Sequence, residues 1–111
     1  MARISNREVG DLVNKREEFV TNNETITSST NSKGLYVVYS YGQHFPMYAH
    51  DADTNQWFGN SDKYSRTTSR HQIHAQPDAD IHWTDTNTMS ALVNSGSYAA
   101  ACADRILQEP P

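Results

Sequence analysis

The sequence has little of what many small-protein functions require. It has one cysteine, Cys102, which excludes a disulfide within the chain and argues against a cysteine-based zinc site. No apolar run is as long as a signal-peptide core or a membrane span, so we expect neither secretion by that route nor insertion, and we expect a cytoplasmic protein. The formal charge of −4 disfavours a global attraction to nucleic acid or anionic membranes.

Established catalytic motifs are also missing. The chain contains no nucleophile elbow, phosphate-binding loop, dinucleotide-binding glycine pattern, zinc-protease helix or paired-carboxylate signature. Serine, histidine and aspartate are frequent, so finding all three types carries little information about a triad. We therefore expect no cofactor, no metal and a non-enzymatic function.

What is present fits one small α+β domain over residues 1–111. A chain of 111 residues can bury a modest core without disulfides, and its 10% aromatic content argues against disorder. Residues 34–77 hold most of the tyrosines, four of the five histidines and the basic cluster. We expect the rest of the chain to be organised around this segment.

The N-terminal part predicts an amphipathic helix from residue 4 to about 21. Ser5 and Glu8 have the spacing of a capping box. The apolar residues that follow recur at helical spacing. These are Val9, Leu12, Val13, Phe19 and Val20.

The middle of the chain predicts strands. Residues 25–27 suit a short edge strand, and 31–34 have turn chemistry. Residues 35–41 are apolar on both alternating faces, which predicts a central strand, although the pattern leaves open whether its tyrosines are core or exposed. Residues 45–58 predict a β-hairpin, with Pro46 at a strand start or edge.

The C-terminal part predicts a short strand and two helices. Ile81 and Trp83 are expected to pack inward from the strand, with His82 outward. Asp85 or Thr86 can cap a helix that carries Met89 and Leu92. A second helix is expected to begin at Ser97 and to bury Cys102. The predicted architecture is thus an N-terminal helix, a three- or four-stranded antiparallel sheet and two C-terminal helices packed on it.

The most unusual stretch is 62–77, in which basic, hydroxyl and imidazole side chains are interleaved and no helix is evident. Arginine offers a planar fork for carboxylate or phosphate, and serine and threonine add neutral donors. We expect this stretch, together with the tip of the predicted hairpin, to form a binding surface. Its residues are Lys63, Tyr64, Arg66, Thr67, Arg70, His71 and His74.

Four other interpretations of these side chains remain open. The arginines can simply pair with the domain's own carboxylates. His71 and His74 have a spacing that on a helix places two nitrogens near one metal ion. Exposed tyrosines and the arginines can bind single-stranded nucleic acid by stacking and phosphate contacts. A metal-independent phosphodiesterase is the last interpretation. Its residues would be His44, Tyr64, Arg66, Arg70 and His71.

Part of the chain also resembles a group of small uncharacterised proteins carried by bacteriophages and mobile elements. The similar text comprises Tyr36–Gly42 (YVVYSYG), Phe45–Met47 (FPM), Trp57–Phe58 (WF) and Asp62–His71 (DKYSRTTSRH). The resemblance covers about two fifths of the chain and implies no particular chemistry. It implies an accessory protein that binds a host protein or protein–nucleic acid complex in the bacterial cytoplasm, for example a counter-defence inhibitor such as an anti-CRISPR.

Overall fold

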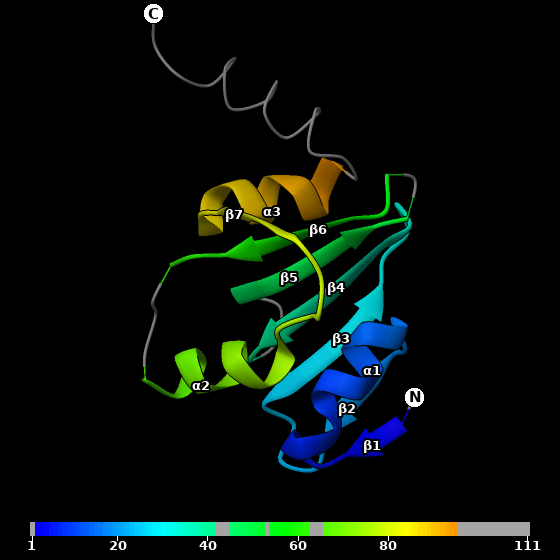
Figure 1. The fold of residues 1–111 in the computed structure, drawn as a ribbon, viewed down its shortest axis with the longest axis vertical. Coiled ribbons are helices and arrows are strands. Elements are labelled where there is room, and N and C mark those ends of the chain that lie inside the picture. Colours follow the sequence, from blue (N-terminus) through cyan, green and yellow to red (C-terminus); the bar gives the residue numbers. More distant parts are fainter. Residues whose placement is uncertain (1, 42–44, 53, 63–65, 96–111) are drawn as a thin grey trace, which may run out of the picture.

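The protein is a seven-stranded sheet flanked by helices on both faces. The structure, a computed structural model, describes residues 2–41, 45–52, 54–62 and 66–95 (Figure 1). The strands follow one another across the sheet in sequence order, and only the outer pairs, β1–β2 and β6–β7, are parallel. The strands are β1 Ala2–Ile4, β2 Phe19–Thr21, β3 Ile26–Thr30, β4 Leu35–Ser40, β5 Phe45–Asp51, β6 Gln56–Asn60 and β7 Ile81–Thr84. The helical elements are the 3₁₀ turn η1 Asn6–Glu8 and the helices α1 Val9–Lys15, α2 Arg66–Ala75 and α3 Thr86–Ser95.

The α+β class is therefore confirmed, but the predicted three or four antiparallel strands are too few. Short strands at both edges of the sheet, β1 and β7, extend it, and each pairs in parallel with its neighbour. Strand β3 is also interior, between β2 and β4, and is not an edge. Within the described residues no helix is long and apolar enough to cross a membrane.

Strand β4 is central, as its two apolar faces predict. All six of its residues are buried. Leu35, Val37 and Tyr39 join one hydrophobic cluster, and Tyr36 and Val38 join the cluster on the opposite face. Alternation along a strand sends neighbouring side chains to opposite faces, so a strand covered on both sides must be apolar on both.

The two clusters show how the helices cover the sheet. Val9 and Val13 of α1 and Ala75 of α2 pack into the cluster that contains Tyr36. Met89 and Leu92 of α3 pack into the other one. Helix α3 is thus one of the two C-terminal helices expected on the sheet; the one expected to begin at Ser97 lies outside the described residues.

The predicted hairpin is confirmed as β5–β6. Strand β5 has an irregularity in its pairing with β4: Tyr39 pairs with Pro46 and Val38 with Tyr48, which leaves Met47 as an extra residue. Such a bulge shifts the alternation of a strand by one. Phe45, Met47 and Tyr48 can consequently all pack into the same cluster.

The predicted helix over residues 4–21 is wrong in extent. Helix α1 ends at Lys15 because Arg16 adopts a left-handed conformation with φ of 56°, which terminates a helix. Phe19 and Val20 then pair with β3. Ser5 does not cap the helix through its side chain; its hydroxyl lies 3.3 Å from a Glu8 carboxylate oxygen. The apolar residues whose spacing suggested one helix are instead divided between a helix and a strand, with a turn between the two.

Strand β7 exists as expected, but Trp83 is only partly inward. Its indole is 49% exposed and meets the Tyr48 ring edge-on at 6.1 Å between centroids. The ring lies over Gly59, where a Cβ atom would come within 2.8 Å of Trp83 Cζ3. Any side chain at Gly59 would clash with the Trp83 ring, so this position requires glycine.

Candidate functional site

The segment expected to be irregular forms helix α2, which is a correction to the sequence interpretation. Threonine, serine and histidine are weak helix formers, and the segment begins without a recognisable apolar stripe. A ten-residue helix is marginal on its own and depends on tertiary packing. Among its described side chains, the buried ones are His71, Gln72 and Ala75.

The packing of α2 on the sheet is largely polar. His71 Nδ1 lies 2.7 Å from the hydroxyl of Ser40 on β4. Tyr48 donates its hydroxyl to the Gln72 carbonyl at 2.8 Å, and Gln72 Nε2 donates to the Asn60 carbonyl at 2.8 Å. These bonds link α2 to three neighbouring strands, so the helix is held at one defined position.

His71 belongs to this attachment and not to the surface. Its side chain is 4% exposed, and its ring centroid lies 5.3 Å from that of Tyr41. Burial, and to a smaller extent the nearby His74, lowers the pKa of His71, so the ring is neutral at neutral pH. It cannot supply positive charge to a partner and instead positions α2.

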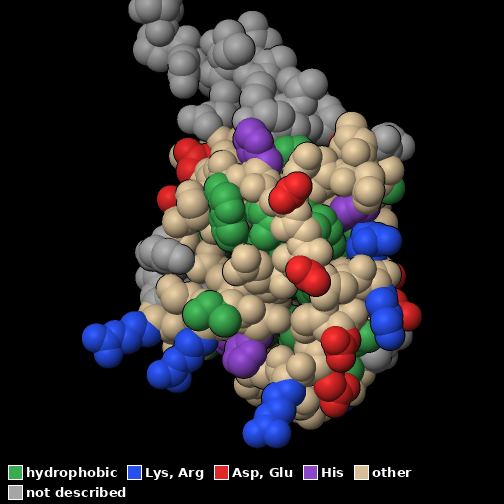
Figure 2. Space-filling model, viewed as in Figure 1, with side chains coloured by type: hydrophobic (Ala, Val, Ile, Leu, Met, Phe, Trp, Pro, Cys, Tyr) green, Lys and Arg blue, Asp and Glu red, His purple; other side chains and the backbone are tan. Residues whose placement is uncertain are grey.

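The opposite side of α2 faces solvent. Arg66, Arg70, Ile73 and His74 follow the i, i+4, i+7, i+8 spacing of one helical face, and all are exposed. We call these four residues the outward face of α2. Ile73 is 74% exposed, and basic side chains extend from the region of α2 in the space-filling view (Figure 2).

The outward face does not contribute to the stability of α2 by its charges. Helix α2 contains no acidic residue, and neither arginine pairs with a described carboxylate. Arg66 is the first described residue of α2, in the N-terminal part of the helix, where the helix dipole disfavours a cation. Arg66 and Arg70, four residues apart, also repel each other. The interpretation that these arginines serve internal ion pairs finds no support in the described part of the chain.

The structure separates the residues that the sequence grouped together. Arg66, Thr67, Arg70 and His74 are exposed on α2, whereas His71 lies on its buried side. Lys63 and Tyr64 lie outside the described residues. For the phosphodiesterase interpretation, His44 and Tyr64 are likewise outside, and His71 is turned away from Arg66. The described members of that set do not converge on one point.

The two remaining interpretations also depend on exposure. His71 and His74 share a helix, but the first is buried against Ser40, and no group of three metal-ligating side chains occurs among the described residues. Tyr36, Tyr39 and Tyr48 are all at most 7% exposed, so they are core. The sequence left open the exposure of Tyr36, Tyr39 and Tyr41: the first two are core, whereas Tyr41 is 50% exposed.

Burial also raises the pKa of the hydroxyl groups of the buried tyrosines. The Tyr36 hydroxyl donates to the Glu17 carbonyl at 2.7 Å, and desolvation is the main cause that raises its pKa to about 12. Burial raises the pKa of Tyr48 as well. Both hydroxyls are therefore neutral structural donors. Among the described aromatic residues, Tyr41 and Trp83 are the ones about half exposed.

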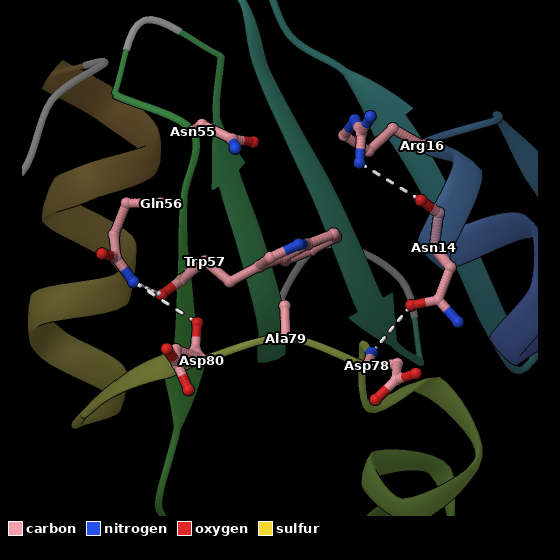
Figure 3. A pocket seen from close by; sticks show the side chains of 8 residues that line it. All are labelled: Asn14, Arg16, Asn55, Gln56, Trp57, Asp78, Ala79 and Asp80. Carbon is pink, nitrogen blue, oxygen red and sulfur yellow. Dashed lines mark hydrogen bonds between the residues drawn. The ribbon is translucent and has the colours of Figure 1, made fainter.

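Sequence reasoning missed a groove of about 650 Å³ on the α1–α2 side of the sheet. Its lining residues are Asn14, Arg16, Asn55, Gln56, Trp57, Asp78, Ala79 and Asp80. Figure 3 shows Arg16 and Asn55 reaching toward each other from opposite walls, with the Trp57 indole between those walls and the segment from Asp78 to Asp80. The sequence shows that acidic residues replace basic ones after Pro77. It does not show that this acidic segment faces the end of α1.

The chain belongs to a family of unknown function, DUF8033, whose model matches residues 7–80. That range contains α2 and every residue that lines the groove. This match does not show a phage or mobile-element origin for the chain. No curated protein and no solved structure matches the chain.

Proposed function

We propose that this member of the family acts without catalysis, by binding a macromolecule through the outward face of α2. The partner is a protein with an acidic surface. If the chain shares the role of the phage-carried proteins that it resembles, the partner is a protein of the bacterial host. Inhibition of a defence complex such as a CRISPR nuclease is one form of this function.

The observation that carries the proposal is the composition of the outward face. Two arginines without described partners share the outward face with an isoleucine that is 74% exposed, on a helix that gains nothing from the arginines. Arginine is among the residues that most often dominate interface energy, and an apolar residue among them gains from desolvation on contact. A surface that is unfavourable for its own helix is explained if another molecule uses it.

An acidic protein suits this face better than nucleic acid does. The face offers two permanent cations on a chain with a formal charge of −4, and it includes one exposed apolar residue, Ile73. Binding to a phosphate backbone is electrostatic and requires many cationic contacts. Tyr36 and Tyr39 are buried, which leaves Tyr41 as the described tyrosine that is exposed enough for stacking. We therefore do not propose binding of single-stranded nucleic acid, and the experiment below distinguishes it from binding of a protein.

The test is affinity purification from bacterial lysate with the Arg66→Ala/Arg70→Ala variant beside the natural chain, with and without nuclease treatment. We expect recovery of a specific protein to fall at least tenfold, because each lost arginine contact is worth about 1 kcal/mol or more. Arg7→Ala/Lys15→Ala removes two exposed cations near or on α1 and is the matched control. Unchanged recovery with the α2 variant would contradict the proposal, and a partner lost on nuclease treatment would indicate nucleic acid.

A further inference from the structure

The groove beside Trp57 has the features of a second binding site, independent of the outward face of α2. We infer that it binds a basic amino acid through both its cationic group and its free carboxylate. Asp78 and Asp80 recognise the cationic group, and Arg16 recognises the carboxylate. The source of this ligand is either the free amino acid or the C-terminal residue of a peptide.

The charges of the groove are opposite and unpaired. Arg16 comes from the end of α1, and Asp78 and Asp80 come from the segment between α2 and β7. None of the three forms an ion pair with another described residue. One guanidinium and two carboxylates leave the groove with a formal charge of −1. A ligand that carries a cationic side chain and a free carboxylate offers a group of opposite charge to each of these two parts of the groove.

The guanidinium is available and oriented. Arg16 uses one nitrogen, Nη1, to donate to the Asn14 carbonyl at 3.2 Å, and its remaining donors are not engaged by described residues. Its left-handed backbone, with φ of 56°, turns the chain at the groove. Figure 3 shows the guanidinium directed across the opening toward the Asn55 amide. A guanidinium beside an amide donor is a suitable receptor for a carboxylate.

The walls are already fixed to one another. The Asp78 amide donates to Asn14 Oδ1 at 2.7 Å, which ties the acidic segment to α1. Gln56 Nε2 donates to the Trp57 carbonyl at 2.8 Å and reaches the Asp80 carbonyl at 3.5 Å, which ties the same segment to β6. A preformed site loses less entropy when a ligand binds. The volume of about 650 Å³ lies in the range of small-molecule sites.

The floor of the groove is rigid and aromatic. Trp57 is 5% exposed and is held edge-on to Tyr36, with 6.2 Å between ring centroids. Its ring also lies 5.0 Å from that of His50. The small exposed part of this fixed indole offers an apolar contact to the methylene chain of a basic side chain, whose cationic end then reaches the carboxylates.

The test is an NMR titration of the full chain with L-arginine and with agmatine, which lacks the carboxylate. We expect saturable shifts at the Trp57 indole and the Asn14, Asn55 and Gln56 side-chain amides, with agmatine about tenfold weaker, as for one lost charge-assisted hydrogen bond. Arg16→Gln should reduce the affinity for L-arginine to the affinity that the natural chain has for agmatine. Asp78→Asn/Asp80→Asn should weaken both ligands.

Two comparisons complete the experiment. An acetylated dipeptide ending in arginine, with a free or an amidated C-terminus, separates the two sources: binding of the free acid in preference to L-arginine indicates a peptide end. Asp11→Asn, an exposed residue of α1 outside the groove, is the control variant and should bind as the natural chain does. Absence of groove shifts at millimolar L-arginine, or equal affinity for arginine and agmatine, would overturn the inference. Arg66→Ala/Arg70→Ala should leave this titration unchanged, so the two proposals can fail separately.

Discussion

Helices α2 and α3 have the same length of ten residues and pack on opposite faces of the sheet, yet they are held by different forces. Helix α3 buries Met89 and Leu92 completely, and the Asp85 carboxylate caps it by accepting the Thr88 amide at 2.8 Å. Helix α2 buries His71, Gln72 and one alanine, and is attached by side-chain hydrogen bonds.

The difference teaches where a small domain can place a functional surface. Apolar burial is non-directional and supplies most folding free energy. Buried hydrogen bonds add little net stability but are costly to break, and they specify one geometry. Helix α2 even buries Gln72 Oε1, which has no hydrogen-bond partner among the described residues. We therefore regard α3 as the stabilising helix and α2 as the positioned one.

The largest effect should come from α3. Leu92→Ala removes a fully buried side chain and leaves a cavity, which costs about 2–5 kcal/mol of unfolding free energy. Urea denaturation followed by circular dichroism measures it. Asn94→Ala, exposed on the same helix, should change stability by less than about 0.5 kcal/mol. A loss below 1 kcal/mol for Leu92→Ala would show that α3 is not the stabilising helix.

A smaller effect should come from the attachment of α2. His71→Ala leaves the buried Ser40 hydroxyl without its partner and should cost about 1–3 kcal/mol. Hydrogen exchange should show the loss concentrated in α2. Adding Ser40→Ala should recover part of it, because no unsatisfied hydroxyl then remains. His74→Ala on the exposed side is the control; equal effects of the two histidine variants would contradict a polar attachment.

The same histidine should make stability depend on pH. Since the pKa of His71 is lowered in the folded state, chiefly by burial, the unfolded chain takes up this proton at higher pH than the folded chain does. The contribution of neutral His71 to the free energy of unfolding is fully present above the ordinary histidine pKa of about 6.5. It is lost as the pH falls through the lower pKa of the folded state. Urea denaturation between pH 5 and 7.5 measures the slope. His71→Gln should flatten it; an unchanged slope would assign the dependence to other groups.

The smallest effect should have the opposite sign. Arg66→Glu places an acid in the first turn of α2 and removes the repulsion with Arg70, so it should stabilise the protein by about 0.3–1 kcal/mol. The same variant should lose the partner in affinity purification. Thr67→Glu adds an acid to the same turn but keeps both arginines, so it should gain similar stability and bind better than Arg66→Glu does. A destabilised Arg66→Glu variant would mean that Arg66 supports the helix.

The sequence predicted those elements whose signals are local. Strand β4 alternates between two apolar faces, the β5–β6 hairpin is bounded by turn residues, and α3 begins at a capping aspartate. It failed where one pattern suits two structures: Val9 to Val20 has helical spacing, yet Arg16 interrupts it and Phe19 pairs with a strand. It failed at α2 because the buried side of that helix is polar, so no apolar stripe marks it.

The candidate sites divide in the same way. Arg66, Thr67, Arg70 and His74 were chosen by residue type and are exposed, but only the helix shows that His71 turns inward. The groove could not be found from the chain, because its walls come from residues 14–16, 55–57 and 78–80. Nothing within any one of these segments indicates the other two.

What the amino-acid sequence determined by itself is the α+β class, the doubly covered central strand and the chemistry available at the surface. These follow from alternation, turn residues and composition, which act over a few neighbouring positions. Only the tertiary structure decided the seven-stranded sheet, the helical state of α2 and the meeting of Arg16 with Asp78 and Asp80. Those outcomes depend on contacts between distant segments, whose free energy can override weak local preferences.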